Sequence, residues 1–481
     1  MDKKKVIGWV VTLALTLFCW CVPTSFYGIE ELTVMQQRII AIFVFAACMW
    51  ITEAIPIWAT SVVIMALMLL TTSTSMLDFL ASGDNLGDPI KYQTIMHEFA
   101  NPTVMLFMGG FVLAIAASKY KLDANLARVV IRLFGTKPKM VMLGFITITA
   151  LLSMFMSNTA TAAMMVAILV PVLASLPESD NKGKVGLALA IPVAANIGGL
   201  GTPIGTPPNV TAVGYLKDLM GIEVSFLQWM LVMVPVVIVI LLVSWLFLGS
   251  VFKSNQKEIV IKIDGTWDTS REAIIVYVTF AVTVLLWVFG NKIGETTTLG
   301  LNSYVVALIP FAVFVITGVF KKADLAKIDW DVLWLVAGGF ALGVGINETK
   351  LADLLVSTIP FGTWSPMLVI LGSGLLCVVM STFMSNSASA ALLIPILITV
   401  GKGMESQLEP FGGITTLIVG LAMAASLAMA LPISTPPNAI AYSKGFIKQK
   451  EMVYVGIFVG VVGLIVGYLV LIFAGKAGLL T

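Results

Sequence analysis

Apolar segments of about 20 residues recur along almost the entire chain, and this pattern limits the possible folds more than any other feature. The run from Leu227 to Leu248, for instance, is apolar on all sides of a helix. Strands of a membrane barrel would instead alternate between apolar and polar residues. Because a helix satisfies its own backbone hydrogen bonds, long apolar segments are stable in a bilayer as helices. The sequence therefore predicts an all-α, polytopic membrane protein.

The composition excludes an ordinary soluble protein. Of the 481 residues, 59% are hydrophobic and 11% are charged, and the mean hydropathy is +1.01. Soluble domains carry roughly 25% charged residues and could not bury this much apolar surface. The formal net charge of +2 gives no reason to expect a nucleic-acid partner, whereas the lipid bilayer is an expected one. The four cysteines lie in apolar segments without zinc-type spacing, and we expect them to pack as free thiols.

Eleven segments are long enough to cross a bilayer as helices. They lie at 6–23, 35–51, 55–71, 102–118, 184–216, 227–250, 273–290, 302–320, 331–347, 412–443 and 453–475. Two further apolar blocks, 138–173 and 366–400, are too long for one crossing of about 20 residues and too short for two crossings with a turn. We interpret both blocks as re-entrant helical hairpins, each of which enters and leaves the membrane on the same side.

The distribution of basic residues supports this topology. With the N-terminus in the cytoplasm and both hairpins re-entrant, 21 of the 28 Lys and Arg residues lie in cytoplasmic segments, among them Lys3, Lys4, Lys5 and Lys262. Such an excess is what the positive-inside rule predicts. A single crossing by either block would move every later loop to the other side and weaken the excess. We therefore expect a multi-pass protein of the cell inner (plasma) membrane with a cytoplasmic N-terminus.

The two halves of the chain resemble each other at an offset near 229 residues. The matching pairs are Met108–Phe111 with Ala337–Phe340, Lys121–Leu122 with Lys350–Leu351, Ser153–Ala163 with Ser381–Ala391, and Pro203–Asn209 with Pro432–Asn438. In the predicted topology the first hairpin opens to the cytoplasm and the second opens to the outside, so the repeats are inverted. Inverted repeats are typical of secondary transporters, whose substrate sites lie near the bilayer midplane where the repeats meet.

The repeat predicts the domain boundaries. The first repeat covers residues 1–250, with scaffold helices in 1–137, the hairpin at 138–173, a broken helix at 184–220 and a helix at 227–250. The second repeat covers residues 251–481, with scaffold helices in 271–360, the hairpin at 366–400, a broken helix at 412–445 and a helix at 453–475.

Each repeat carries two polar motifs inside its apolar segments. Ser157–Thr159 and Ser385–Ser387 lie in the middle of the hairpins, where Ser and Asn side chains favour a reversal of the chain. Thr206–Asn209 and Thr435–Asn438 each contain two consecutive prolines, which break a helix. Each motif alone has a structural explanation as a turn or a kink. Together they form interrupted helices whose free carbonyls suit a small cation and whose N-termini suit a carboxylate.

The predicted core segments, 140–216 and 366–443, carry charges only in the loops between the hairpins and the next helices. These charges are Glu178, Asp180, Lys182, Lys184, Lys402, Glu405 and Glu409. An anion bound in the core would therefore be held by helix dipoles, amides, hydroxyls and bound cations. Sodium bound beside the anion would supply the positive charge that the side chains lack.

The combination of Ser-Asn-Thr-type hairpin tips with Thr-Pro-Pro-Asn breaks resembles the divalent anion/sodium symporter family, which includes bacterial dicarboxylate and citrate carriers. The resemblance covers nearly the whole chain. It implies a homodimer in which a mobile transport domain moves along a fixed scaffold by an elevator mechanism. It also implies sodium-coupled symport of C4-dicarboxylates, namely succinate, malate or fumarate, into the cell.

The resemblance further implies two sodium sites and one substrate site, carried over residue by residue. The first sodium site would use Ser153, Ser157, Asn158 and the carbonyl of Gly205, and the second Ser381, the carbonyl of Met384, Asn386 and the carbonyl of Ser434. The substrate carboxylates would meet Asn158, Thr159, Thr206, Pro207, Asn386, Ser387, Thr435 and Pro436. Ser387 stands where the family usually has Thr; it keeps the hydroxyl and lacks a methyl group, which puts substrate size or affinity in question.

Three alternatives differ in what they need from the sequence. The sequence distinguishes only weakly between a sodium symporter and a sodium-independent exchanger of dicarboxylates or citrate with the same fold. A membrane enzyme would need a metal cluster or a nucleophile–base pair, but the single histidine, His97, has no HExxH motif around it and the core segments have no carboxylate pair. A passive channel does not call for broken helices in inverted repeats. We therefore expect a transporter and not an enzyme.

Overall fold

The computed structural model describes residues 3–259, 266–296 and 301–480, so Lys262 lies outside the described residues. Helices account for 77% of the residues. No strand occurs in these ranges, and the pairing of Ser73 with Ile90 is an isolated bridge. The prediction of an all-α fold is confirmed.

The first half contains eleven α-helices in the described ranges. They are α1 (Lys3–Cys21), α2 (Val34–Thr52), α3 (Ile57–Thr71), α4 (Tyr92–His97), α5 (Pro102–Lys119), α6 (Leu122–Leu133), α7 (Pro138–Ser153), α8 (Asn158–Ser175), α9 (Asn181–Gly198), α10 (Pro207–Met220) and α11 (Phe226–Val251). Short 3-10 helices join them: η1 (Thr24–Tyr27), η2 (Asp78–Leu80), η3 (Glu98–Ala100), η4 (Glu178–Asp180) and η5 (Gly199–Gly201).

The second half repeats this order from α15 onwards. Its helices are α12 (Arg271–Thr296), α13 (Ser303–Val306), α14 (Leu308–Ile316), α15 (Trp330–Glu348), α16 (Leu351–Thr358), α17 (Pro366–Phe383), α18 (Asn386–Gly403), α19 (Glu405–Leu408), α20 (Gly413–Ser426), α21 (Pro436–Tyr442) and α22 (Gln449–Lys476). Its 3-10 helices are η6 (Lys322–Lys327), η7 (Phe361–Thr363) and η8 (Glu409–Phe411).

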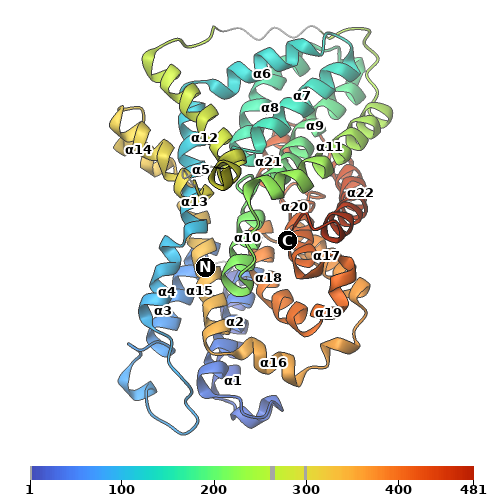
Figure 1. The fold of residues 1–481 in the computed structure, drawn as a ribbon. Helices are drawn as coiled ribbons and strands as arrows, with labels where there is room; N and C mark the ends of the chain where they lie inside the picture. The colour runs from blue at the N-terminus through green and yellow to red at the C-terminus, as the bar shows by residue number, and fades with distance from the viewer. Residues whose placement is uncertain (1–2, 260–265, 297–300, 481) are drawn as a thin grey trace.

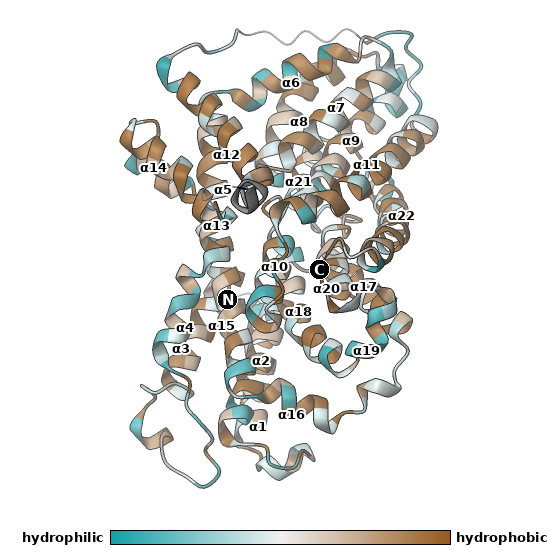
Figure 2. Cartoon of the chain, viewed as in Figure 1, coloured by the Kyte–Doolittle hydropathy of each residue, from teal (hydrophilic) through white to brown (hydrophobic). Residues whose placement is uncertain are grey.

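Ten helices of the described part are long and apolar enough to cross a membrane, and there are eleven if the bent pair Glu405–Phe411 and Gly413–Ser426 counts as one span. A chain with many membrane spans is thereby confirmed. The outer faces of α11, α12, α14 and α22 are strongly apolar in Figure 2. Apolar side chains such as Phe473 and Leu246 are exposed on these faces, as expected for membrane-spanning helices.

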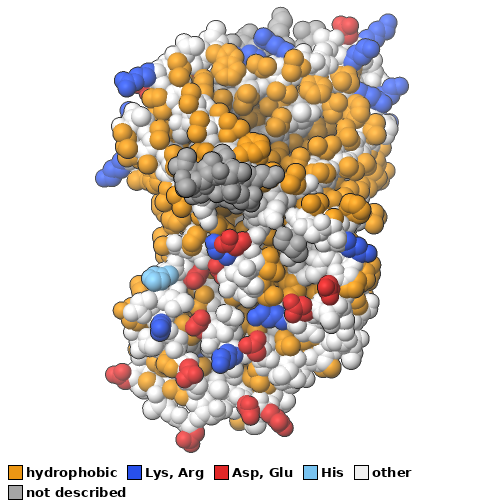
Figure 3. All heavy atoms as spheres, viewed as in Figure 1, with side chains coloured by type: hydrophobic (Ala, Val, Ile, Leu, Met, Phe, Trp, Pro, Cys, Tyr) orange, Lys and Arg blue, Asp and Glu red, His pale blue; other side chains and the backbone are white. Residues whose placement is uncertain are grey.

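Charged side chains gather towards the two ends of the molecule. Figure 3 shows Lys and Arg along the upper rim, whereas most Asp and Glu side chains lie in the lower part. Figure 1 places α6 and α7 at the upper end, and α1 and α16 near the lower end. In this view the upper rim is mainly basic, whereas the lower part carries both acidic and basic side chains. An excess of basic side chains at one end is what the positive-inside rule predicts for the cytoplasmic side.

Two pairs of packed helices occupy the predicted hairpin segments. α7 ends at Ser153 and α8 begins at Asn158, while α17 ends at Phe383 and α18 begins at Asn386. Pro138 and Pro366 open α7 and α17, where a missing N–H group costs no helix hydrogen bond. The course of these hairpins relative to the bilayer remains a prediction.

The two halves repeat local structure as well as helix order. α5 and α15 are each followed by a residue in the left-handed region, Lys121 with φ 57° and Lys350 with φ 56°, and then by a short helix. Gly109 lets α5 approach the backbone at Ala307 near α14, and Gly338 lets α15 approach Ser61 of α3. A Cβ atom at either glycine would overlap the neighbouring helix, so both glycines permit close helix packing.

The halves are interlocked at the centre of the molecule. α10, from the first half, packs against α18 and α20 of the second half. α21, from the second half, packs against α8 and α9 of the first half. Each short helix that follows a Pro-Pro break therefore lies against the hairpin of the other half (Figure 1).

Candidate functional site

Oxygen atoms from three segments converge at the tip of the first hairpin. The hydroxyl of Ser153, fully buried at the end of α7, donates to the carbonyl of Ala195 at 2.7 Å. The amide group of Asn158 lies 2.5 Å from Ser153 Oγ. The amide orientation that satisfies its neighbours places Nδ2 3.2 Å from the carbonyl oxygens of both Gly205 and Ala195. Ser153, Asn158 and Gly205, predicted to share a sodium site, therefore lie together.

The remaining residue of the first predicted sodium set is less closely placed. Ser157 precedes α8 as its N-cap, is half-buried, and makes no side-chain cap hydrogen bond. The structure thus brings three of the four predicted residues into one cluster and leaves Ser157 at its edge.

Two glycines allow the first break to reach this tip. A Cβ atom at Gly205 would overlap the carbonyl oxygen of Gly199, and a Cβ atom at Gly199 would come within 2.6 Å of Asn158 Oδ1. The chain between α9 and α10 can therefore fold back on the tip only because these positions carry no side chain.

The first break is held together by side chains that the sequence did not indicate as site residues. Asn209 Nδ2 donates to the carbonyls of Gly199 at 3.0 Å and Thr202 at 2.8 Å. The Thr202 hydroxyl donates to the carbonyl of Met154 in the hairpin turn, and Trp229 Nε1 donates to the carbonyl of Leu200 at 2.9 Å. These bonds satisfy backbone groups released by the interrupted helix, as buried polar groups require.

The second break follows the same principle with different partners. Asn438 Nδ2 donates to the carbonyls of Met429 at 2.7 Å and Leu431 at 2.9 Å. Ser434 Oγ donates to the carbonyl of Thr382 at 2.8 Å, which joins this break to the end of α17. The Asn at the end of each Thr-Pro-Pro-Asn motif therefore stabilises the break. The presence of the motif in both halves of the sequence is the feature that could have identified these two residues.

The second predicted sodium set is assembled less tightly than the first. Ser381 is fully buried, and among the described residues the one polar partner of its hydroxyl is Cys377 Sγ, at 3.9 Å. Met384 is buried at the end of α17. Asn386 Oδ1 is buried and has no hydrogen-bond partner among the described residues. A buried amide oxygen in that state is able to serve a cation, although no hydrogen bond of the described residues joins Ser381 or Asn386 to Ser434.

The predicted substrate residues stand at the N-terminal ends of four helices. Asn158 and Thr159 begin α8, Asn386 and Ser387 begin α18, Thr206 and Pro207 begin α10, and Thr435 and Pro436 begin α21. Thr159 and Pro436 are exposed, Asn158, Asn386, Ser387 and Pro207 are half-buried, and Thr206 and Thr435 are buried.

Two of these four helix ends have backbone donors without a capping partner. The N-caps of α8 and α18 make no side-chain cap hydrogen bond. α10 and α21 each begin with two prolines, which have no N–H group; the first N–H of α10, from Asn209, bonds to the Thr206 carbonyl at 3.1 Å, and that of α21, from Asn438, bonds to Thr435 Oγ1 at 3.3 Å. Free N–H groups at a helix N-terminus attract an anion, and the helix dipole adds to this attraction. The arrangement therefore suits the carboxylates of a small anion.

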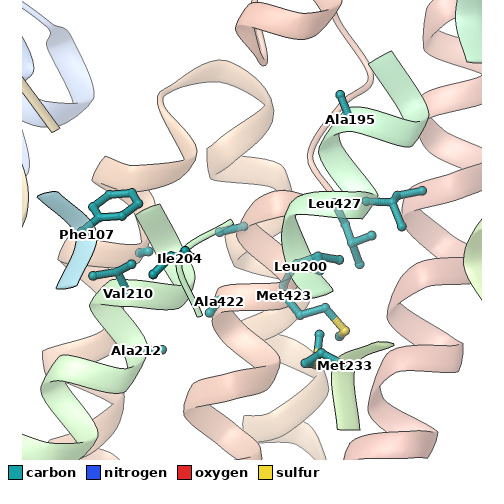
Figure 4. Close-up of a cluster of buried hydrophobic side chains, with 14 of the residues drawn as sticks. Phe107, Ala195, Leu200, Ile204, Val210, Ala212, Met233, Ala422, Met423 and Leu427 are labelled. Carbon is teal, nitrogen blue, oxygen red and sulfur yellow. The ribbon is translucent and has the colours of Figure 1, made fainter. Parts of the chain in front are cut away.

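The neighbourhood of the breaks is apolar. Figure 4 shows Leu200 of the first break beside Met423 and Leu427 from the region of α20, and Ile204 of the same break near Phe107 and Val210. No group of three or more His, Cys, Asp and Glu side chains lies together in the described part of the chain. Neutral oxygens in an apolar setting fit a hard monovalent cation better than a transition metal, which prefers nitrogen or sulfur ligands.

A cavity of about 320 Å³ has Pro203 of the first break among its lining residues. It is bounded by the start of α11, by Trp287 and Val288 of α12, and by Tyr304 of α13. None of the predicted site residues lines it.

One residue outside every predicted set connects the two halves at the site. Asn196, in the last turn of α9, donates from Nδ2 to Thr435 Oγ1 at 3.1 Å and to Asn438 Oδ1 at 3.2 Å. The internal repeat does not point to Asn196, because the position 229 residues later is Ala425.

Comparison with known proteins gives one family and several similar chains. The family model described as the sodium:sulfate symporter transmembrane region matches residues 3–477. The sodium-dependent dicarboxylate transporter SdcS of Staphylococcus saprophyticus is 32% identical over 506 residues, which cover 98% of this chain and 92% of that protein. SdcS of Staphylococcus aureus is 32% identical over 501 residues, with 97% of this chain and 92% of that protein covered.

Two solved structures resemble the fold. The YdaH transporter of Alcanivorax borkumensis superposes with a TM-score of 0.56 at 15% identity, covering 88% of this chain and 99% of that chain. MtrF of Neisseria gonorrhoeae superposes with a TM-score of 0.53 at 13% identity, covering 87% of this chain and 94% of that chain. At such low identity these likenesses concern the fold alone.

Proposed function

The chain belongs to the family described as the sodium:sulfate symporter transmembrane region, and on that premise we propose that it moves C4-dicarboxylates into the cell together with sodium. It is a transporter and not an enzyme. Its relatives of 32% identity carry the name sodium-dependent dicarboxylate transporter. Succinate, malate and fumarate are the substrates that we propose.

The cluster at the first hairpin tip is the observation that carries this proposal. Neutral oxygens from a hairpin and a broken helix meet at one point around the Asn158 amide, namely the Ser153 hydroxyl and the carbonyls of Ala195 and Gly205. A sodium ion bound there would link the two segments, and its charge would lie close to the N-terminus of α8. We propose a second sodium site at Ser381, Met384, Asn386 and Ser434, where the buried Asn386 Oδ1, which has no hydrogen-bond partner among the described residues, would coordinate the cation.

The four helix ends support a substrate with two anionic groups. Asn158 and Thr159 of the first tip and Asn386 and Ser387 of the second would each meet one carboxylate, aided by the breaks at Thr206–Pro207 and Thr435–Pro436. In such a site the sodium ions neutralise the substrate charge, since arginine and lysine are absent from these segments. A site that pairs both carboxylates rejects an analogue with only one, because buried donors are then left unmet.

We place the protein in the bacterial plasma membrane, with its N-terminus in the cytoplasm. The proposed assembly is a homodimer in which α1–α6 and α12–α16 form the scaffold. The remaining helices, α7–α11 and α17–α22, would form the transport domain and move as an elevator between the two faces of the membrane. Inverted repeats with interrupted helices at their interface support alternating access of this kind.

The proposal is tested with the purified chain in proteoliposomes. Uptake of radiolabelled succinate is measured under inward gradients of sodium, potassium or choline, and we expect uptake in sodium only. Equal uptake in all three salts would assign the chain to the sodium-independent exchangers instead.

Competition with unlabelled compounds identifies the substrate class. We expect strong inhibition by succinate, malate and fumarate, and weak inhibition by butyrate and lactate, with a difference of up to about 10⁴-fold in a well-formed site. Equal competition by mono- and dicarboxylates would contradict the two-tip site. Sulfate and citrate, tested in parallel, separate a C4-dicarboxylate site from one for other divalent anions.

A further inference from the structure

Two consecutive residues at the end of α9 contact both halves of the proposed site. The carbonyl of Ala195 accepts the hydroxyl of Ser153 in the first hairpin, at 2.7 Å. The side chain of the next residue, Asn196, donates to Thr435 Oγ1 at 3.1 Å in the second break. One turn of helix therefore joins the first sodium cluster to a proposed substrate residue of the other half.

The hydrogen-bond network fixes which atoms Asn196 presents. Asn438 Nδ2 already donates to the carbonyls of Met429 and Leu431, so Asn438 turns its Oδ1 towards Asn196. Asn196 must then face it with Nδ2, since two amide oxygens would repel each other. The same Nδ2 reaches Thr435 Oγ1, whose second bond comes from the backbone N–H of Asn438.

Burial makes this link energetically important. Asn196 is 2% exposed, Asn438 2% and Thr435 4%. A buried donor or acceptor that loses its partner pays its full desolvation cost, so the three side chains favour a single arrangement. A shift of the last turn of α9 would therefore be transmitted to the Thr435 hydroxyl.

We propose that Asn196 is a positioning residue that couples sodium binding at the first tip to dicarboxylate binding at the second break. The inference rests on the proposed function and adds a route between its two sites. Sodium held by Ser153, Asn158 and Gly205 fixes the end of α9 through the Ala195 carbonyl. Asn196, one residue further on, then holds the Thr435 hydroxyl in place for a carboxylate.

The link from the end of α9 to a Thr-Pro-Pro-Asn break has no equivalent in the second half. The position equivalent to Asn196 in the second half is Ala425, which has no side-chain donor. Thr206, the equivalent of Thr435, is buried and makes no side-chain cap hydrogen bond. The first sodium site is therefore connected to the second break, and the second sodium site has no matching connection to the first break through this position.

The proposal predicts a measurable coupling factor. Sodium should raise the affinity for succinate, and succinate should raise the affinity for sodium by the same factor, as linkage requires. Factors of about 5–150 are typical of coupled sites. When the Asn196 amide is removed, we expect this coupling factor to fall by about tenfold.

The experiment uses the purified full chain in nanodiscs. Succinate Kd is measured at low and at saturating sodium for the wild type, Asn196→Ala and Asn196→Asp, which has the same size as Asn but no N–H group to donate. Asn125→Ala is the control, because Asn125 of α6 is equally buried and, within the described part of the chain, its amide bonds only to Tyr277 OH, at 3.2 Å. Thermal unfolding of each variant measures folding separately.

We expect both Asn196 variants to lose most of the sodium effect on succinate Kd, and Asn125→Ala to retain it. The double variant Asn196→Ala with Thr435→Val should bind succinate about as weakly as Thr435→Val alone, because Asn196 acts through Thr435. A folded Asn196→Ala protein with the wild-type coupling factor would overturn the proposal. A wild type whose succinate Kd ignores sodium would overturn the proposed sodium coupling as well as this link.

Discussion

The two interrupted helices share a sequence motif but are anchored differently. In the first half, the chain around Gly199 and Gly205 lies directly on the hairpin tip, where it meets Asn158. In the second half, Ser434 reaches the hairpin backbone at Thr382, and Asn196 of the first half holds Thr435. The internal repeat reproduces the helix order in both halves. The local hydrogen bonds depend on a few residues that differ between the two repeats. The two proposed sodium sites are therefore expected to differ in affinity and in their effect on the substrate.

The largest difference between the two halves is expected when the equivalent amide is removed from each hairpin tip. Asn158→Ala deletes the group that lies between Ser153, Ala195 and Gly205, so we expect succinate uptake to fall below about 1% of wild type, a loss of more than 2.7 kcal/mol. Asn386→Ala deletes an amide oxygen that has no partner among the described residues, and we expect a smaller loss at saturating sodium. Initial uptake rates at several sodium concentrations measure both effects.

Equal losses in the two variants would show that the tips work alike despite their different surroundings. Surface expression and thermal unfolding of each variant serve as the controls for folding.

A second comparison uses the equivalent positions Gly205 and Ser434. Gly205→Ala places a Cβ atom against the carbonyl of Gly199, so the first break must move away from the tip. We expect at least a tenfold loss of uptake, about 1.4 kcal/mol. Ser434→Ala removes one hydroxyl that bonds to the Thr382 carbonyl, and about 1 kcal/mol is the usual value of such a bond.

Uptake rates at fixed sodium distinguish the two variants. A Gly205→Ala protein with wild-type transport would mean that the first break does not need its close approach to Gly199.

A third comparison concerns the scaffold, where the buried carboxylate of Asp324 pairs with two partly exposed lysines, one of which has no counterpart at the equivalent position of the other half. Lys119 Nζ, at the end of α5, lies 2.6 Å from Asp324 Oδ2, and Lys327 Nζ lies 2.9 Å from Asp324 Oδ1. The residue equivalent to Lys119 at the end of α15 is Glu348. We expect Asp324→Asn to lower the unfolding free energy by about 2 kcal/mol, the scale of hydrogen bonds to a charged group.

The same carboxylate predicts an acid-dependent loss of stability. Burial alone would raise the pKa of Asp324, but hydrogen bonds from Lys119, from the backbone N–H of Lys321 and from Lys327 outweigh burial and lower that pKa. A lowered pKa in the folded state contributes stability at neutral pH, and this contribution is lost as pH falls below about 4, the value for an unperturbed Asp. Thermal unfolding from pH 7 to pH 3 should show a steeper decline for the wild type than for Asp324→Asn; parallel curves would contradict the assignment.

The smallest expected effect compares the hydroxyls of the two tips. Thr159 is exposed at the start of α8, and Ser387 is half-buried at the start of α18. Thr159→Ala and Ser387→Ala should each raise succinate Kd about fivefold, near 1 kcal/mol, the net value of one hydrogen bond. Ser387→Thr restores the methyl group usual in the family and keeps the hydroxyl, so it should change Kd by less than either Ala variant. A larger change in Ser387→Thr would mean that the missing methyl group sets substrate size.

The sequence determined the fold class and the segments that carry the site. Long apolar runs can be satisfied only by membrane helices, and the confirmed all-α, multi-span architecture follows from that requirement. The paired motifs around Asn158 and Asn386, and around Thr206 and Thr435, located the helix interruptions, because Pro-Pro pairs and Ser-Asn turns have strong local preferences. The roles of these residues in binding sodium and substrate remain predictions.

Which segments of the two halves contact each other is evident only from the tertiary structure. That α10 lies against α18, and α21 against α8, depends on packing between residues more than 150 positions apart, about which local preferences carry no information. The structural role of Asn209 and Asn438 depends on carbonyl groups that become available only when the chain folds back at each break. The link from Asn196 depends on the Thr435 hydroxyl, which folding brings within hydrogen-bond distance of its amide. A buried amide takes its partners from three-dimensional proximity, and one asparagine in an apolar helix does not reveal those partners in the sequence.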